Sequence, residues 1–284
     1  MTTLIHDGLL LSPLREKFGD LRGRVAVAGS ALVAYSGGVD SALVAFVAQR
    51  ELGDHCLAVT ADSPAVPRAQ IEDARRFADE VGLRHEIIVT AELDVPGYRD
   101  NAANRCFFCK TELYGKMTAL ARQLGLAVVL DGTNADDAVD FRPGIAAGQQ
   151  QGVASPLRDA GFGKDEVREL SRLLGLPTWD RPAAACLSSR VAYGVPVTAE
   201  VLARIEEGEE GLHALGFRQV RVRHHGALVR IEVGPEELPR ALDPDMAARF
   251  VDLFKDLGYT LVSLDLEGYR SGSLTDALGD GRGQ

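Results

Sequence analysis

The fold of this chain is decided by one stretch, Ala31-Leu32-Val33-Ala34-Tyr35-Ser36-Gly37-Gly38-Val39-Asp40-Ser41. It starts as a short apolar run typical of a β-strand, turns at Ser-Gly-Gly, and continues into a helix-forming run that ends at Leu52. A strand, a glycine turn and a helix in this order present the free N–H groups of a helix N-terminus to an anion. The glycines let the backbone approach a phosphate without a Cβ in the way. The stretch therefore predicts an α/β fold with a phosphate-binding loop.

Asp40 distinguishes this loop from the common nucleotide-binding loops. The G-x-x-x-x-G-K-[ST] loop requires a lysine that is absent here, and the G-x-G-x-x-G pattern is absent from the stretch as well. A carboxylate beside a bound phosphate is repelled by it unless a cation lies between them. Asp40 therefore indicates a Mg²⁺ ion that bridges the carboxylate and a pyrophosphate. Taken alone, the same residues also suit an ordinary helix N-terminus with Asp and Ser as capping residues.

Length and composition are those of a globular protein. The 284 residues, 46% of them hydrophobic and 25% charged, suffice for one large domain or two modest ones. A net charge of −10 argues against bulk nucleic acid as a partner, because binding phosphate backbones needs a basic face. Four cysteines are too few for a disulfide scaffold, and we found neither a signal core nor an apolar run long enough to span a bilayer. We therefore expect a cytoplasmic protein without a membrane partner.

Strands alternate with helices through the first part of the chain. Strands are expected at 31–34, 55–60, 85–89 and 127–130, and helices at 4–28, 39–52, 68–81, 107–124 and 164–174. This alternation implies a parallel sheet with right-handed crossovers, whose ligands bind beyond the carboxyl ends of the strands. Three polar stretches fall at such ends, and they begin at Ser36, Asp62 and Asp131. For Asp136 and Asp137, in the last of these, a solvated turn is an equally good interpretation.

The pattern changes after Pro196. Helices are expected at 198–215, 235–240 and 244–257, and strands at 217–223, 228–233 and 259–266. The first two strands alternate with period two and are joined by His224-His225-Gly226-Ala227, which predicts a hairpin with the histidines in the turn. These elements form a small α+β domain. We therefore predict a first domain over residues 1–185, a second over 186–274 and a flexible tail over 275–284.

The cysteines have different contexts. Cys56 lies in a strand pattern and is most simply a small buried residue. Cys106 and Cys109 form a C-x-x-C pair, which can be redox-active, bind zinc or be incidental to function. Cys186 precedes Ser188-Ser189-Arg190, and a nearby Arg190 would lower the pKa of its thiol, although a structural thiol in a linker is the alternative. A closed zinc site needs four ligands, whereas three thiolates could hold a 4Fe-4S cluster whose open iron binds a sulfide.

The predicted hairpin carries a charged face. Arg221 and Arg223 on one strand and Arg230 and Glu232 on the other alternate with valine and isoleucine. A solvated charged face is one interpretation of this pattern. In an acidic protein, however, three arginines on one face also suit a substrate that bears a phosphate and carboxylates.

Two resemblances follow from these motifs. Ser36 to Ser41 resembles the pyrophosphate loop of the S-G-G-x-D-S ATP pyrophosphatases, which include GMP synthetase, NAD synthetase, asparagine synthetase and the tRNA thiolases. Over nearly the whole chain, from the first helix to Ser273, the sequence is similar to the LarE family of sulfur transferases. The matching motifs are 177–182, 185–190, 193–194, 216–226 and 264–273.

The LarE resemblance implies a fold, a reaction and a site. The fold is the parallel sheet of the adenine-nucleotide α-hydrolase type with a smaller C-terminal α+β domain. The reaction is ATP- and Mg²⁺-dependent adenylation of a carboxylate of pyridinium-3,5-dicarboxylate mononucleotide, followed by its conversion to a thiocarboxylate for the nickel-pincer cofactor of lactate racemase. A homo-oligomer is expected. The implied ATP-binding residues are Ser36, Gly37, Gly38, Asp40, Ser41, Asp62 and Ser63, and the implied substrate-binding residues are Lys110, Ser189, Arg190, Arg221, Arg223 and Arg270.

Two sulfur sources are known in that family. One form gives up the sulfur of a single cysteine, at the position matching Cys186, and is left with dehydroalanine. The other holds an iron–sulfur cluster on three cysteines. Because this chain has Cys106 and Cys109 as well as Cys186, we favour the cluster. A tRNA thiolase and a non-catalytic nucleotide sensor are the alternative functions.

Overall fold

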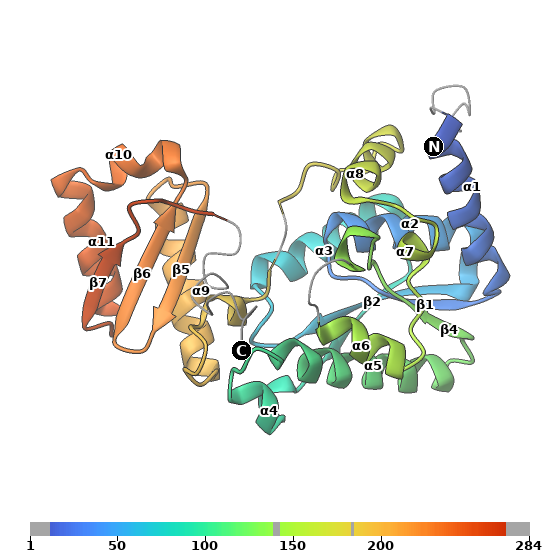
Figure 1. Cartoon of the computed structure of the whole chain (residues 1–284), viewed down its shortest axis with the longest axis horizontal. Helices are drawn as coiled ribbons and strands as arrows, with labels where there is room; N and C mark the ends of the chain where they lie inside the picture. The colour runs from blue at the N-terminus through green and yellow to red at the C-terminus, as the bar shows by residue number, and fades with distance from the viewer. Residues whose placement is uncertain (1–11, 139–142, 183–184, 271–284) are drawn as a thin grey trace, which may run out of the picture. The chain divides into compact units, whose positions relative to one another are not determined.

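The computed structural model describes residues 12–138, 143–182 and 185–270. The chain divides into two compact units, one formed by residues 1–95 and 104–184 and the other by residues 96–103 and 185–284 (Figure 1). None of the helices in the described part of the chain combines the length and the apolar character needed to span a bilayer.

The first unit is built on a parallel sheet of four strands in the order β3-β2-β1-β4. The strands are β1 Ala31–Ala34, β2 Cys56–Asp62, β3 His85–Val89 and β4 Val128–Leu130. Ala31 of β1 pairs with Cys56 on one side and with Val128 on the other. The α/β fold with a parallel sheet is confirmed, and Cys56 is buried as predicted.

Helices cover both faces of this sheet. They are α1 Ser12–Val27, α2 Val39–Leu52, α3 Arg68–Val81, α5 Arg105–Gln123, α6 Pro143–Gln150, α7 Pro156–Asp159 and α8 Lys164–Leu173. Ala31 and Val33 pack into a core shared with α1, α2, α3 and α8, whereas Leu32 packs on the opposite face against α5. Because neither face of β1 meets water, its sequence is a continuous apolar run rather than an alternating one.

The second unit contains a three-stranded sheet in the order β5-β6-β7. Its strands are β5 Val220–His225, β6 Leu228–Val233 and β7 Leu261–Leu264, with helices α4 Pro96–Arg99, α9 Ala199–Ala214, α10 Leu238–Ala241 and α11 Pro244–Asp256. β5 and β6 are antiparallel, and β6 and β7 are parallel. The predicted tail over 275–284 lies outside the described residues.

The prediction for the hairpin turn is wrong in one respect. His224 and His225 belong to β5, and His225 pairs with Leu228, so the turn consists of Gly226 and Ala227 alone. Gly226 has a φ of +73°, which a two-residue hairpin turn requires and glycine adopts readily. His224 is buried and shares a hydrogen bond of 3.0 Å with the Tyr259 hydroxyl, so packing draws it into the strand.

Residues 96–103 leave the first unit between β3 and α5 and are fastened inside the second. Tyr98 and Ser188, both buried, share a short hydrogen bond. The fully buried Asn101 donates its side-chain amide to the carbonyls of Ala192 (2.8 Å) and Val195 (2.9 Å). Its φ of +53° makes it the one residue other than glycine with a positive φ in the described chain. These contacts hold the segment against the stretch that follows Cys186.

Replacing Asn101 should destabilise the fold. We expect Asn101→Ala to lower the free energy of unfolding by roughly 1–3 kcal/mol, because it leaves buried carbonyls without a donor. Asn101→Gly removes the same amide but suits the positive φ, so it should cost less than the alanine variant. Urea unfolding of both variants measures the difference. An alanine variant as stable as the wild type would contradict this account of the segment.

Candidate functional site

The glycine loop joins the carboxyl end of β1 to the amino end of α2. Gly37 has a φ of +81°, a conformation that residues with a Cβ rarely adopt. The hydroxyl of Ser41 accepts a hydrogen bond from the Ser36 N–H (3.1 Å) and donates one to the Gly38 carbonyl (3.1 Å). The loop is therefore held in shape by its own residues.

The segment after β4 packs directly against this loop. A Cβ on Gly132 would lie 2.6 Å from the backbone nitrogen of Ser41, a distance that no real Cβ tolerates. Position 132 therefore requires glycine for close approach rather than for its φ. The ends of β1 and β4 meet at one edge of the sheet, which is the edge where ligands of parallel sheets bind.

Asp40 is held by partners from two other elements. Its carboxylate forms an ion pair with Lys164, the first residue of α8, and accepts a hydrogen bond from the Asn134 amide (3.1 Å). The Asn134 carbonyl oxygen in turn accepts from the N–H groups of Asp136 (3.0 Å) and Asp137 (3.2 Å). The Lys164 N–H donates to Asp136 (2.6 Å). Asp136 and Asp137 are therefore part of a network beside the loop and not merely a solvated turn.

Lys164 is the residue that sequence reasoning missed. The sequence pattern assigns it only to the start of a helix, and its separation of 124 positions from Asp40 leaves no local signal of the pairing. A lysine at the amino end of a helix that follows a ligand-binding strand end is the one available hint. Its ammonium group places a positive charge directly at the loop.

Asp62 and Ser63 lie at the carboxyl end of β2, the strand beside β1. Asp62 forms an ion pair with Arg68 (2.5 Å). Ser63 is buried and donates a short hydrogen bond to the buried carboxylate of Glu92. Both residues are at the edge of the sheet where the sequence predicted them.

Cys106 and Cys109 lie in the first turns of α5, where a spacing of three residues places them on one side of the helix. Cys106 is exposed and Cys109 is half-buried. The next residue, Lys110, lies with its ammonium group 5.2 Å from the centre of the Tyr114 ring. The Tyr114 hydroxyl donates to Asp131 at the end of β4 (2.9 Å).

The environment of Lys110 keeps it charged. Tyr114 raises the pKa of Lys110, burial opposes this effect, and Cys109 and Asp131 add to the rise. A raised pKa means that the ammonium group stays protonated at neutral pH. The C-x-x-C helix therefore carries a fixed positive charge beside Cys109.

Cys186 precedes a short 3₁₀ helix, Leu187–Arg190, in the second unit. The guanidinium of the buried Arg190 donates to the carbonyl of Cys186 (3.0 Å) and to the hydroxyl of Ser189 (3.1 Å). It also forms an ion pair with Glu209 of α9 (3.0 Å). The main chain at Cys186 is therefore fixed by a charged group that is itself paired.

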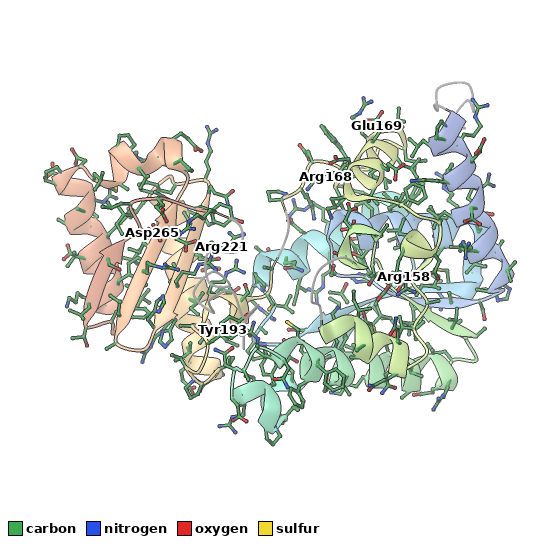
Figure 2. The ribbon with its side chains drawn as sticks, in the orientation of Figure 1. Arg158, Arg168, Glu169, Tyr193, Arg221 and Asp265 are labelled. Carbon is green, nitrogen blue, oxygen red and sulfur yellow. The ribbon has the colours of Figure 1, made fainter. Side chains whose placement is uncertain are left out.

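The arginine face of the hairpin is largely buried. Glu232 is fully buried and binds Arg223 (2.8 Å) and Arg230 (3.2 Å), and Arg230 also binds Asp265 (3.3 Å). Burial and the neighbouring Arg190 lower the pKa of Arg221. Figure 2 shows Arg221 and Asp265 on the sheet of this unit. A solvated charged face, the alternative interpretation of this pattern, is therefore wrong.

The remaining predicted substrate residues lie in the same unit. Arg223 donates to the carbonyl of Ser189 (3.3 Å), which brings the hairpin and the Cys186 segment together. Arg270 is exposed and forms an ion pair with Glu267. Within residues 12–138, 143–182 and 185–270, no group of three His, Cys, Asp or Glu side chains is arranged to hold a metal ion.

Comparison with known proteins bears on this site. The family model for asparagine synthase matches residues 24–140, which include the glycine loop. An uncharacterised protein of Synechocystis sp. is 46% identical over 94% of this chain and 97% of its own length. Pyridinium-3,5-bisthiocarboxylic acid mononucleotide synthase of Lactiplantibacillus plantarum is 36% identical over 87% of this chain and 89% of its own length.

The chain belongs to the LarE family. A more distant similarity is to one component of the glutamine-hydrolysing GMP synthase of Thermococcus kodakarensis, which is 30% identical over 58% of this chain and 56% of its own length. In this LarE family member the glycine loop is thus the ATP loop of a PP-loop enzyme.

Lys164 should be needed for turnover of ATP. We expect Lys164→Met to lower kcat/KM for AMP formation roughly 10- to 150-fold, the equivalent of one charge-assisted hydrogen bond. Lys17→Met is the matched control, because Lys17 pairs with Glu166 of α8 on the surface (2.7 Å) and should affect activity little. Measured AMP release that is equally fast in both variants would show that Lys164 only caps Asp40.

Proposed function

We propose that this chain is an ATP-dependent sulfur transferase that converts a carboxylate of pyridinium-3,5-dicarboxylate mononucleotide to a thiocarboxylate. The observation that carries the proposal is the preformed glycine loop with Asp40 at its end, in a chain 36% identical to the Lactiplantibacillus plantarum synthase. A loop of this kind binds the phosphates of ATP through N–H groups, and the nickel-pincer cofactor of lactate racemase is the proposed destination of the product.

Adenylation is the first step. A carboxylate oxygen of the substrate attacks the α-phosphorus of ATP, the bond from that phosphorus to the bridging oxygen breaks, and pyrophosphate leaves. The N–H groups of the glycine loop and the ammonium group of Lys164 stabilise the charge on the departing pyrophosphate. Asp40 is the residue that would hold Mg²⁺, which supplies further neutralisation of the phosphates when bound. Its partly exposed carboxylate at the loop fits that ion.

Substrate binding is assigned to the second unit. Arg221, Arg223 and Arg190, with Ser189 beside them, present guanidinium and hydroxyl donors suited to phosphate and carboxylate oxygens. Lys110 of the first unit and the exposed Arg270 are proposed to add further positive charge.

Sulfur transfer is the second step. Cys106 and Cys109 suit a 4Fe-4S cluster, because both thiols lie on one side of a helix and Cys106 is exposed. Cys186 is the proposed third ligand. When bound, such a cluster supplies a sulfide that replaces AMP on the activated carboxylate. In the alternative, the Cys186 thiolate attacks the carbonyl carbon, AMP leaves, and cleavage of the Cβ–S bond yields the thiocarboxylate and dehydroalanine.

The cysteines separate the two sulfur sources. If a cluster is present, Cys106→Ala, Cys109→Ala and Cys186→Ala should each abolish iron binding in protein reconstituted without oxygen, while the buried Cys56→Ala retains it. Iron and sulfide analysis measures this. Intact mass after reaction should stay unchanged. An active, iron-free sample whose Cys186 becomes dehydroalanine would overturn the cluster.

The hairpin arginines should differ in what they support. Arg221→Ala should weaken binding of the mononucleotide roughly 10- to 100-fold and leave ATP binding intact, because one charge-assisted contact is lost. Arg223→Ala should instead lower stability, by about 3–5 kcal/mol, because it removes a partner of the fully buried Glu232. Isothermal titration and thermal unfolding distinguish them. Equal loss of both ligands in Arg221→Ala would mean that Arg221 is structural.

A further inference from the structure

Arg181 is a loosely bound cation at the ATP loop. Its guanidinium donates to the carbonyl of Gly37 at 3.4 Å and lies 3.7 Å from the carboxylate of Asp73. Both distances are long for a guanidinium, whose charge-assisted hydrogen bonds normally measure 2.7–2.9 Å. About a quarter of the side chain is exposed. Among the described residues, Arg181 therefore lies beside the loop with only weak partners there.

The other charged and polar groups around the loop are more tightly held or uncharged. Lys164 is bound directly by Asp40. Gln70 of α3 donates to the Ser36 carbonyl at 2.6 Å. Tyr35, which precedes the loop, is buried, and burial raises the pKa of its hydroxyl, so it is neutral. A polyphosphate entering the loop would thus find Arg181 as the guanidinium most easily released to it.

The segment that carries Arg181 is fastened to α8. Arg168 of that helix donates to the carbonyls of Trp179 (2.8 Å) and Arg181 (2.7 Å). Figure 2 shows Arg168 on α8, whose first residue, Lys164, pairs with Asp40. The segment over 176–182 is therefore connected to the loop twice, through α8 and through the Arg181 side chain. Along the chain it leads to Cys186.

We propose that Arg181 binds the phosphates of ATP and thereby couples occupancy of the loop to the conformation of residues 176–182. The guanidinium exchanges the Gly37 carbonyl and Asp73 for phosphate oxygens, which are stronger acceptors because they are charged and match its fork geometry. In the proposed sulfur transferase, Arg181 is then a positioning residue for the segment before Cys186. The inference rests on the proposed function only in requiring that the loop bind ATP.

Trp179 reports this coupling directly. It is the only tryptophan of the chain, it is partly exposed, and it lies two residues before Arg181. We expect its fluorescence emission to shift saturably when Mg²⁺ and α,β-methylene-ATP bind, and to respond far less to AMP. In Arg181→Met the dissociation constant should rise roughly 10- to 100-fold and the emission shift should vanish at saturation. Arg181→Lys should recover part of the affinity.

The control and the contrary outcomes are defined by calorimetry on the same samples. Arg172→Met removes an exposed arginine of α8 that pairs with Glu169, and it should keep wild-type affinity and emission. Wild-type behaviour of Arg181→Met, or binding to the wild type without any emission shift, would overturn the inference alone. A wild-type chain that binds no nucleotide would overturn the proposed function as well. Circular dichroism verifies that each variant is folded.

Discussion

The ion pair between Asp40 and Lys164 is the interaction on which the ATP loop depends. A carboxylate at the end of a phosphate-binding loop is unfavourable unless a cation neutralises it, and Lys164 supplies that cation. The pair also connects the loop to α8 and, through Asn134, to the segment after β4. When Mg²⁺ takes the carboxylate, as we propose, the ammonium group becomes available to the leaving pyrophosphate.

The second unit solves a related problem by a different means. Glu232 is a fully buried carboxylate, and the desolvation of its charge is offset by Arg223 and Arg230 on the same hairpin. The alternation of charged and apolar residues along β5 and β6 therefore does not separate a wet face from a dry one. It separates an apolar core from a buried ionic network, at the edge of which burial and Arg190 lower the pKa of Arg221.

The chain is divided in a way that bears on the proposed sulfur chemistry. Cys106 and Cys109 begin α5 of the first unit, whereas Cys186 lies in the second. Residues 96–103, which run directly before α5, are anchored inside the second unit by Tyr98 and Asn101. The two cysteine-bearing segments are thus each attached to the stretch around Ser188, one by contacts and one by the chain itself.

The sequence alone determined the elements and the edge of the sheet where chemistry is expected. Apolar runs, the glycines of the loop and the order of strands and helices are local signals, and they predicted the parallel sheet, the strand ends and residues such as Asp40 and Ser63. Only the tertiary structure decided which distant groups meet these residues. Lys164 reaches Asp40 across 124 positions, Gly132 is required by a contact with Ser41, and His224 enters β5 through packing on Tyr259. Such pairings depend on how elements pack in space, and a one-dimensional pattern carries no record of that distance.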